Sequence, residues 1–115
     1  VMVSLDCETT ARKVNSTFHY LGWPKSFADR TANLIEAKAS WTIGRRVNDF
    51  VVRLTPRGKD VCMIDLRSAS RHDRRDLGMN LLIINRFMGQ FTFEFLKEHE
   101  RLRKMIPERS ERSTL

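Results

Sequence analysis

The stretch DLRSASRHDRRDLGMN, residues 65–80, decides the fold because it joins a strand pattern to a helix pattern. Before it, residues 61–68 alternate between an apolar face and a more polar one, which predicts a strand. After it, apolar residues keep helical spacing: Ile84, Phe87, Met88, Phe91, Phe95 and Leu102. This spacing predicts a long helix that begins near Leu77 or Met79 and ends before Pro107.

A first helix is predicted over residues 6–21. Asp6 is suited to cap its N-terminus, and Gly22 followed by Pro24 would end it. Its apolar residues recur at spacings of three and four: Ala11, Val14, Phe18 and Leu21. The helix therefore has one apolar stripe that can pack on a sheet.

The middle of the chain predicts strands joined by short turns. Residues 35–43 and 50–55 alternate with period two, and 23–27 could form a further short strand. The inward residues of the three main strands are Ile35, Ala37, Ala39, Trp41 and Ile43; Phe50, Val52 and Leu54; and Cys62, Ile64 and Leu66. Turns at 44–46 and 56–59 are too short for parallel crossovers, so the strands must be antiparallel.

These elements predict an α+β two-layer sandwich with the order helix, meander of three or four strands, helix. Both helices would cover one face of the sheet, and the two layers would share an aromatic core: Phe18, Trp41, Phe50, Phe87, Phe91 and Phe95. Residues 1–106 would form one domain and 107–115 a polar, frayed tail.

Composition narrows the classes of function. The 115 residues carry 21 Lys and Arg against 14 Asp and Glu, a net charge of +7. This charge favours an anionic partner, such as an anionic ligand, a membrane surface or nucleic acid, or it serves solubility alone. No apolar run approaches the length of a membrane span. The two cysteines, Cys7 and Cys62, allow a disulfide without favouring it, so they leave the redox compartment open. Cys62 is most simply a buried core residue.

The corner of the fold, residues 65–80, gathers most of the candidate site residues. Asp76 would cap the long helix, Arg67 or Arg71 could clamp it through a bidentate ion pair, and Gly78 would let the helix approach the sheet. A tentative anion site beside the helix N-terminus would use basic and hydroxyl side chains: Arg67, Ser68, Ser70, Arg71, Arg74 and Arg75. The alternative is a solvated loop whose charges pair internally, since Asp73 and Asp76 reduce the positive field.

The same corner carries a family resemblance. The pattern D-x-R-S-x-S-R, four residues, then D-x-G-x-N, which ends at Asn80, resembles the closing motif of domain of unknown function 1499. Weaker upstream matches are Leu21-Gly22-Trp23, Ile35-Glu36-Ala37 and 48–53. The chain departs from the family at Asp73, where Gly is usual, and at 81–83, where basic residues are usual. The resemblance implies no activity, but it favours a bacterial cell-envelope location.

Taken together, these patterns favour a non-enzymatic binding module. We expect neither cofactor nor metal, since His19, His72 and His99 lie far apart and no Gly-rich phosphate loop occurs. One alternative is an assembly domain of a larger membrane-associated protein, with a homodimer or another protein docked on the C-terminal helix. A remote alternative is a hydrolase using the Ser, His, Asp and Arg side chains of the corner. Nucleic-acid binding is disfavoured because no reading motif is present.

Overall fold

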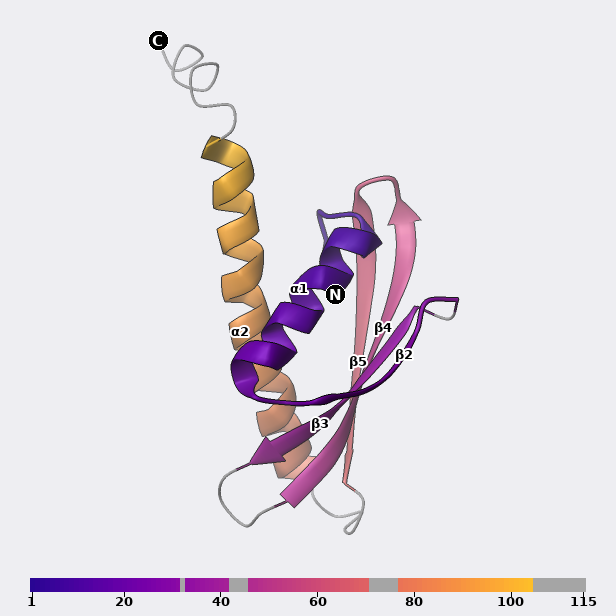
Figure 1. Cartoon of the computed structure of the whole chain (residues 1–115), viewed down its shortest axis with the longest axis vertical. Helices are drawn as coiled ribbons and strands as arrows, with labels where there is room; N and C mark the ends of the chain where they lie inside the picture. Colours follow the sequence, from indigo (N-terminus) through magenta and orange to yellow (C-terminus); the bar gives the residue numbers. More distant parts are fainter. Residues whose placement is uncertain (32, 42–45, 71–76, 105–115) are drawn as a thin grey trace.

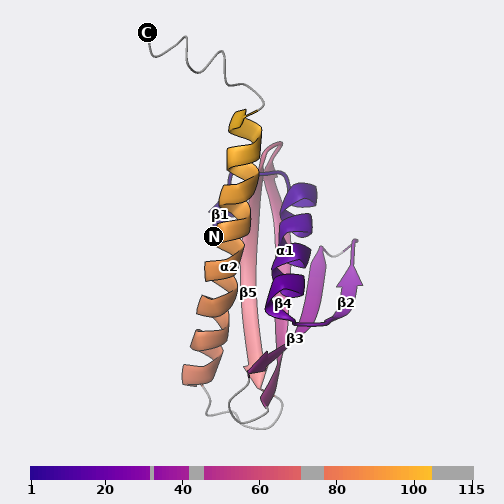
Figure 2. The same ribbon diagram turned by 60° about the vertical axis from the view of Figure 1, so that its left-hand side comes forward.

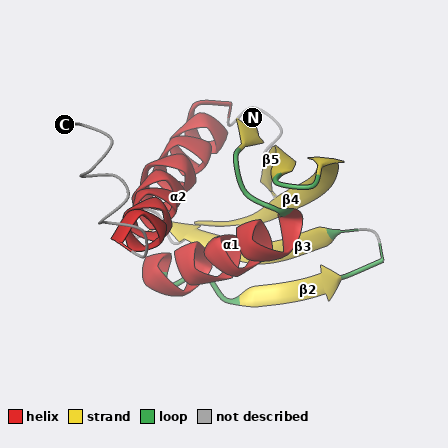
Figure 3. Cartoon of the chain, turned by 90° about the horizontal axis from the view of Figure 1, so that it is seen from above, coloured by secondary structure: helices red, strands yellow, loops and turns green. Residues whose placement is uncertain are grey.

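The computed structural model of the chain describes residues 1–31, 33–41, 46–70 and 77–104. Its elements are β1 (Met2–Val3), α1 (Cys7–Leu21), β2 (Lys25–Asp29), β3 (Leu34–Trp41), β4 (Arg46–Gly58), β5 (Val61–Ser70) and α2 (Leu77–Lys104). The five strands form one antiparallel sheet in the order β1-β5-β4-β3-β2. Both helices pack on the same face of it, α1 on β4 and β5 and α2 on β5 and α1 (Figures 1 and 3). The predicted α+β two-layer fold is confirmed.

Local signals at both ends of α1 explain its bounds. The Asp6 carboxylate accepts a hydrogen bond from the Thr9 backbone N–H at 3.0 Å. Hydrogen bonds from the Thr9 side chain and then from its backbone hold the pKa of Asp6 below its ordinary value. Gly22 ends the helix with φ 72°, a left-handed conformation that a residue with a side chain rarely adopts. The helix predicted over residues 6–21 is thereby confirmed.

The core lies between the sheet and the two helices. Most of the predicted inward residues are buried there: Val14, Phe18, Ile35, Ala37, Ala39, Phe50, Val52, Leu54, Cys62, Ile64, Phe87 and Phe91. Phe50 makes an edge contact with Phe18 and a tilted contact with Phe87, at centroid distances of 6.0 and 4.8 Å, which are favourable aromatic geometries. Leu66 and Phe95 are partly buried against this core, and the side chain of Trp41 lies outside the described residues.

The two helices lie side by side (Figure 2), and a charged contact also joins them. Lys13 of α1 and Glu98 of α2 form an ion pair at 2.8 Å, and Arg101 donates to the same carboxylate at 2.8 Å. The Arg101 hydrogen bond, followed by that from Lys13, lowers the pKa of Glu98 to about 2. Because Glu98 is buried, these two cations stabilise its charge in place of water.

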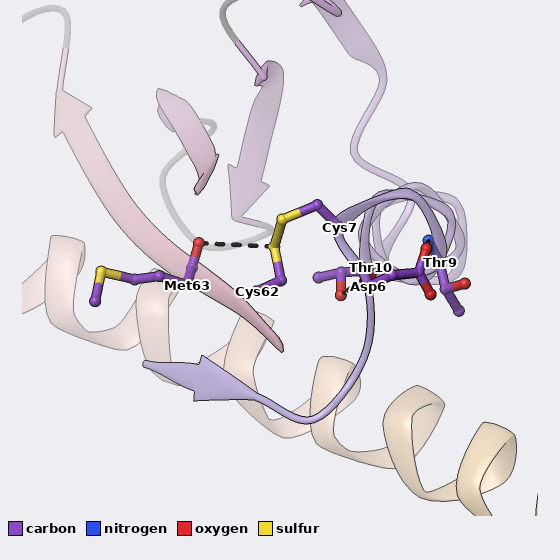
Figure 4. The surroundings of a disulfide bond; sticks show 6 residues. All are labelled: Asp6, Cys7, Thr9, Thr10, Cys62 and Met63. Atoms are coloured by element: carbon purple, nitrogen blue, oxygen red, sulfur yellow. Dashed lines mark hydrogen bonds between the residues drawn. A yellow bond between two sulfur atoms is a disulfide. The ribbon is translucent and has the colours of Figure 1, made fainter. Parts of the chain in front are cut away.

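A disulfide joins the start of α1 to β5 (Figure 4). Cys7 and Cys62 stand 55 residues apart in sequence, and their Cα atoms lie 5.0 Å apart. The predicted burial of Cys62 is confirmed, since its side chain is fully enclosed in the core. The sequence left the disulfide open because neither cysteine has a local pattern that identifies its partner.

Several boundaries differ from those predicted. β1, which pairs with β5 through Met2 and Val3, was not predicted because two residues show no periodicity. The short strand predicted over 23–27 is β2, Lys25–Asp29, and Trp23 is instead a buried core residue. The tight turn predicted at 56–59 is present but lies later, at residues 59–60, because β4 continues through Pro56 to Gly58 with an irregular register.

Candidate functional site

The register of β4 and β5 brings polar residues together at one end of the sheet. Asn48 of β4 lies opposite Ser70 of β5, and Phe50 lies opposite Ser68. Phe50 faces the core, so Asn48, two residues before it, lies on the same face. Asn48 and Ser68 are thus held on the helix side of the sheet, where the apolar core ends.

Asn80, in the first turn of α2, completes a polar cluster with these two residues. Its Oδ1 accepts a hydrogen bond from Asn48 Nδ2 at 2.8 Å and another from Ser68 Oγ at 2.9 Å. These bonds join three elements, β4, β5 and α2. We call Asn48, Ser68 and Asn80 the polar corner.

Asn48 is buried with part of its hydrogen-bonding capacity unused. Its side chain is 1% exposed, and its Oδ1 has no hydrogen-bond partner among the described residues. The oxygen and nitrogen of both amides, those of Asn48 and Asn80, could also be exchanged by a 180° rotation, and the atom without a partner would then be Asn48 Nδ2. One polar atom of Asn48 therefore lacks a partner among the described residues in either arrangement. Leaving a buried polar atom unsatisfied costs about 1–3 kcal/mol, which a bound ligand that pairs with it would recover.

The residues predicted for an anion site are only partly brought together. Arg67 lies opposite Val51 and is exposed on the outer face of the sheet, away from Ser68 on the inner face. The strand therefore places these two neighbours on opposite sides. Arg71, Arg74, Arg75 and Asp76 lie outside the described residues, as do the side chain of Ser70 and the surroundings of Gly78.

Asn48 is the site residue that sequence reasoning missed. It has the parity of Phe50, Val52 and Leu54, so its position in the strand already pointed inward. The sequence signal that could have found it was a polar amide at a position where the strand alternation expects a buried apolar residue.

Among the described residues, no group of His, Cys, Asp and Glu side chains is placed to hold a metal ion. No described helix is long and apolar enough to cross a membrane.

Comparison with known proteins identifies the family and the fold. No curated protein matches the sequence. Among solved structures, the chain is similar to one in a crystal structure of the adenylate sensor from AMP-activated protein kinase in complex with the ribofuranotide ZMP. That likeness has a TM-score of 0.62 at 11% identity and covers 80% of this chain and 94% of the other. At this identity it concerns the fold alone.

The family comparison covers most of the chain, including Asn48, Ser68 and Asn80. The matching family is described as "Protein of unknown function (DUF1499)", and its model aligns with residues 5–91. The predicted resemblance is therefore confirmed, and the chain belongs to the DUF1499 family of proteins of unknown function.

Proposed function

We propose that this domain is a binding module that holds a small phosphorylated alcohol at the polar corner. The observation that carries the proposal is the buried amide atom of Asn48 that has no hydrogen-bond partner among the described residues and lies beside the N-terminus of α2. An anionic group would be favoured at the helix N-terminus, whose first turn, Leu77 to Asn80, carries no acid. A ligand hydroxyl would donate to Asn48 Oδ1. Both features occur together in a phosphorylated alcohol.

Charge supports an anion at this end of the molecule. The whole chain has a net charge of +7, and the segment just before α2 in sequence carries three arginines, Arg71, Arg74 and Arg75, against the two acids Asp73 and Asp76. We infer binding rather than turnover, because the Ser68 hydroxyl pairs with the Asn80 amide, which cannot act as a general base.

The direct test is isothermal titration calorimetry with glycerol 3-phosphate as the probe. The same chemistry also occurs in a lipid headgroup, so vesicles of phosphatidylglycerol and of phosphatidylcholine form a second arm. We expect Asn48→Ala and Ser68→Ala each to weaken binding roughly tenfold. The first removes the hydrogen bond to the ligand, and the second removes the hydrogen bond that holds Asn80 in the polar corner. Asn15→Ala, a change at an exposed asparagine of α1, is the matched control.

The outcomes separate the two sources of the ligand. Saturable binding of glycerol 3-phosphate supports a free metabolite, and binding of phosphatidylglycerol vesicles alone supports a headgroup. The proposal fails if neither binds, or if both corner variants bind as well as the Asn15→Ala control. Circular dichroism spectra of all variants would show whether a loss reflects unfolding.

We also propose that the protein works in an oxidising compartment, in keeping with a bacterial cell envelope. The Cys7–Cys62 disulfide supports this location, because such bonds form and persist mainly in exported proteins. Alkylation of cells before lysis, followed by mass spectrometry, would measure the redox state of both cysteines. Alkylation of both thiols in the untreated cell would contradict this location.

A second candidate function is assembly through α2. Leu82 and Leu96 are 49% and 55% exposed and stand seven residues to either side of the exposed Gly89. This symmetric spacing would let two antiparallel copies of α2 place each Leu82 against the partner's Leu96, with the glycines allowing close approach. Sedimentation velocity should then show a dimer that Leu82→Glu disrupts. A wild-type monomer at high concentration would exclude it.

A further inference from the structure

The two cysteines of the disulfide lie in different surroundings. Cys62 belongs to β5, where Val3 of β1 pairs with it on one side and Pro56 of β4 on the other. Its exposed fraction is 0%. Cys7 is the first residue of α1 and is only partly buried against the core. Burial therefore closes the Cys62 side of the bond and leaves the Cys7 side as the way in for a reagent.

A groove gives access to the Cys7 side. It has a volume of about 610 Å³ and lies between α1 and the β2–β3 side of the sheet. Cys7, Ala11 and Asn15, which follow one another at intervals of four residues on one side of α1, line it together. Cys62 is not among its described lining residues. The volume falls within the range of small-molecule sites, so the groove can admit a small thiol.

The core already offers Cys62 an acceptor that only a free thiol can use. Cys62 Sγ lies 3.9 Å from the backbone oxygen of Met63 (Figure 4). A disulfide sulfur carries no hydrogen and cannot donate to that oxygen, whereas a thiol is a weak donor. A charged thiolate would be costly in these apolar surroundings. If the bond opens, Cys62 can therefore stay in the core as a neutral, hydrogen-bonded thiol.

We infer that the disulfide is a redox-responsive joint, which a small thiol opens at Cys7. The thiolate sulfur of the incoming molecule attacks Cys7 Sγ and forms a new S–S bond, while the Cys7–Cys62 bond breaks. The electron pair of the broken bond passes to Cys62 Sγ, which takes up the proton that the incoming thiol gave up. The incoming sulfur is oxidised, Cys62 is reduced, and the product is a mixed disulfide at Cys7.

Burial of Cys62 also makes this product persist. The thiolate is the nucleophile in thiol–disulfide exchange, and a buried neutral thiol attacks the mixed disulfide only slowly. The start of α1 thus loses its covalent attachment to β5 and carries the added group on the groove side. The inference does not depend on ligand binding at the polar corner, which shares no residue with the groove.

Peptide mapping of the wild-type protein tests which sulfur is attacked. The oxidised protein is incubated with reduced glutathione at mildly alkaline pH without denaturant, and acid stops the exchange while most of the protein is still oxidised. Mass spectrometry then locates the glutathione. We expect it on Cys7, with Cys62 recovered as a free thiol. The same reaction in concentrated urea, where both sulfurs are accessible, should label both cysteines and is the control.

Two results would overturn the inference. Glutathione found equally on Cys7 and Cys62 without denaturant would mean that exchange requires unfolding of the chain. Absence of any glutathione adduct would mean that the bond is closed to small thiols in the folded protein.

Single-cysteine variants measure the two sulfurs separately. Cys62→Ala leaves Cys7 as a free thiol, and Cys7→Ala leaves Cys62. In the folded variants, oxidised glutathione should modify Cys7 at least roughly tenfold faster than Cys62, because only Cys7 is accessible. In urea the two rates should be similar. Equal rates in the folded variants would contradict the protection of Cys62, and the wild-type mapping stands even if a variant fails to fold.

A matched pair of variants tests the approach through the groove. Ala11→Leu should slow glutathione exchange several-fold, because a side chain at residue 11 of a helix extends over the preceding turn, where Cys7 lies. Ser16→Leu makes a similar addition at an exposed position of α1 outside the described groove lining, and it should leave the rate unchanged. Equal rates in the two variants would contradict an approach along the groove.

Discussion

At the scale of single residues, Glu98 is a group among the described residues whose pKa is strongly lowered by the fold. Arg101 and Lys13 lower its pKa to about 2, from an ordinary value of 4.5. A carboxyl group with a lowered pKa in the folded state adds stability above its unfolded pKa and loses that contribution as the pH falls. Glu98 should therefore stabilise the protein above pH 4.5, and this stabilisation should disappear between about pH 4.5 and pH 2.

Urea denaturation at pH 7 and at pH 3 would measure this effect. We expect Glu98→Gln to lower the unfolding free energy at pH 7 and to make stability less dependent on pH below 4.5. Glu100→Gln, at an exposed position of the same helix, is the control. A pH dependence in Glu98→Gln equal to that of the wild type would contradict the role of the Lys13–Glu98–Arg101 contact.

The polar corner shows what residue-scale sequence reasoning can and cannot find. The importance of Ser68 and Asn80 could be predicted because both belong to a distinctive motif. That Arg67 lies on the other side of the sheet could also have been read from strand alternation. The bond between Asn48 and Asn80, however, joins residues 32 apart in sequence, and only the packing of α2 on the sheet determines it.

At the scale of elements, two glycines in helical surroundings should respond oppositely to the same substitution. Gly22 ends α1 at φ 72°, so Gly22→Ala should destabilise the protein by about 1 kcal/mol. Gly89 is exposed within α2, and an added Cβ would meet no atom within 4 Å. Gly89→Ala should therefore stabilise the monomer by up to about 1 kcal/mol through higher helix propensity.

Thermal unfolding of the two variants at low protein concentration would check whether Gly22→Ala lowers the melting temperature and Gly89→Ala raises it. The two variants serve as controls for each other, since the chemical change is identical. A lower melting temperature for Gly89→Ala would mean that the face of α2 around Gly89 is already in close contact with another chain. That result would favour assembly through α2 over an isolated monomer.

Elements with long, regular patterns were predicted well. β3, β4 and β5 alternate over enough residues to identify their buried faces, and α1 has recognisable signals at both ends. The apolar stripe of α2 was harder because the helix is apolar on more than one side. Ile83 and Phe87 are core residues, whereas Phe93 is exposed.

At the scale of the whole molecule, the disulfide should contribute strongly to stability. It closes a loop between residues 55 apart, and the chain-entropy model assigns roughly 4 kcal/mol to a loop of this length. A small domain with one core depends heavily on such a constraint. Reduction should therefore lower the unfolding free energy by roughly that amount.

Urea unfolding with and without a phosphine reductant would measure this contribution. A Cys7→Ser, Cys62→Ala double variant should be less stable than the oxidised protein and insensitive to reductant. If the oxidised and reduced wild-type proteins unfold at the same urea concentration, the constraint contributes nothing. The sequence could not predict this feature because the pairing depends on where α1 starts relative to β5, which is a property of the assembled fold.

The irregular register of β2 has a consequence for how copies of this protein behave in concentrated solution. β2 is an edge of the sheet, and it carries Phe27, which is 51% exposed. A regular apolar edge would act as a template for aggregation, because a second molecule could add its own strand there. The break in register between Lys25 and Phe27, together with the lysine charge, interrupts that template. The same short strand therefore gives the sheet an edge that disfavours the addition of a strand from a second molecule.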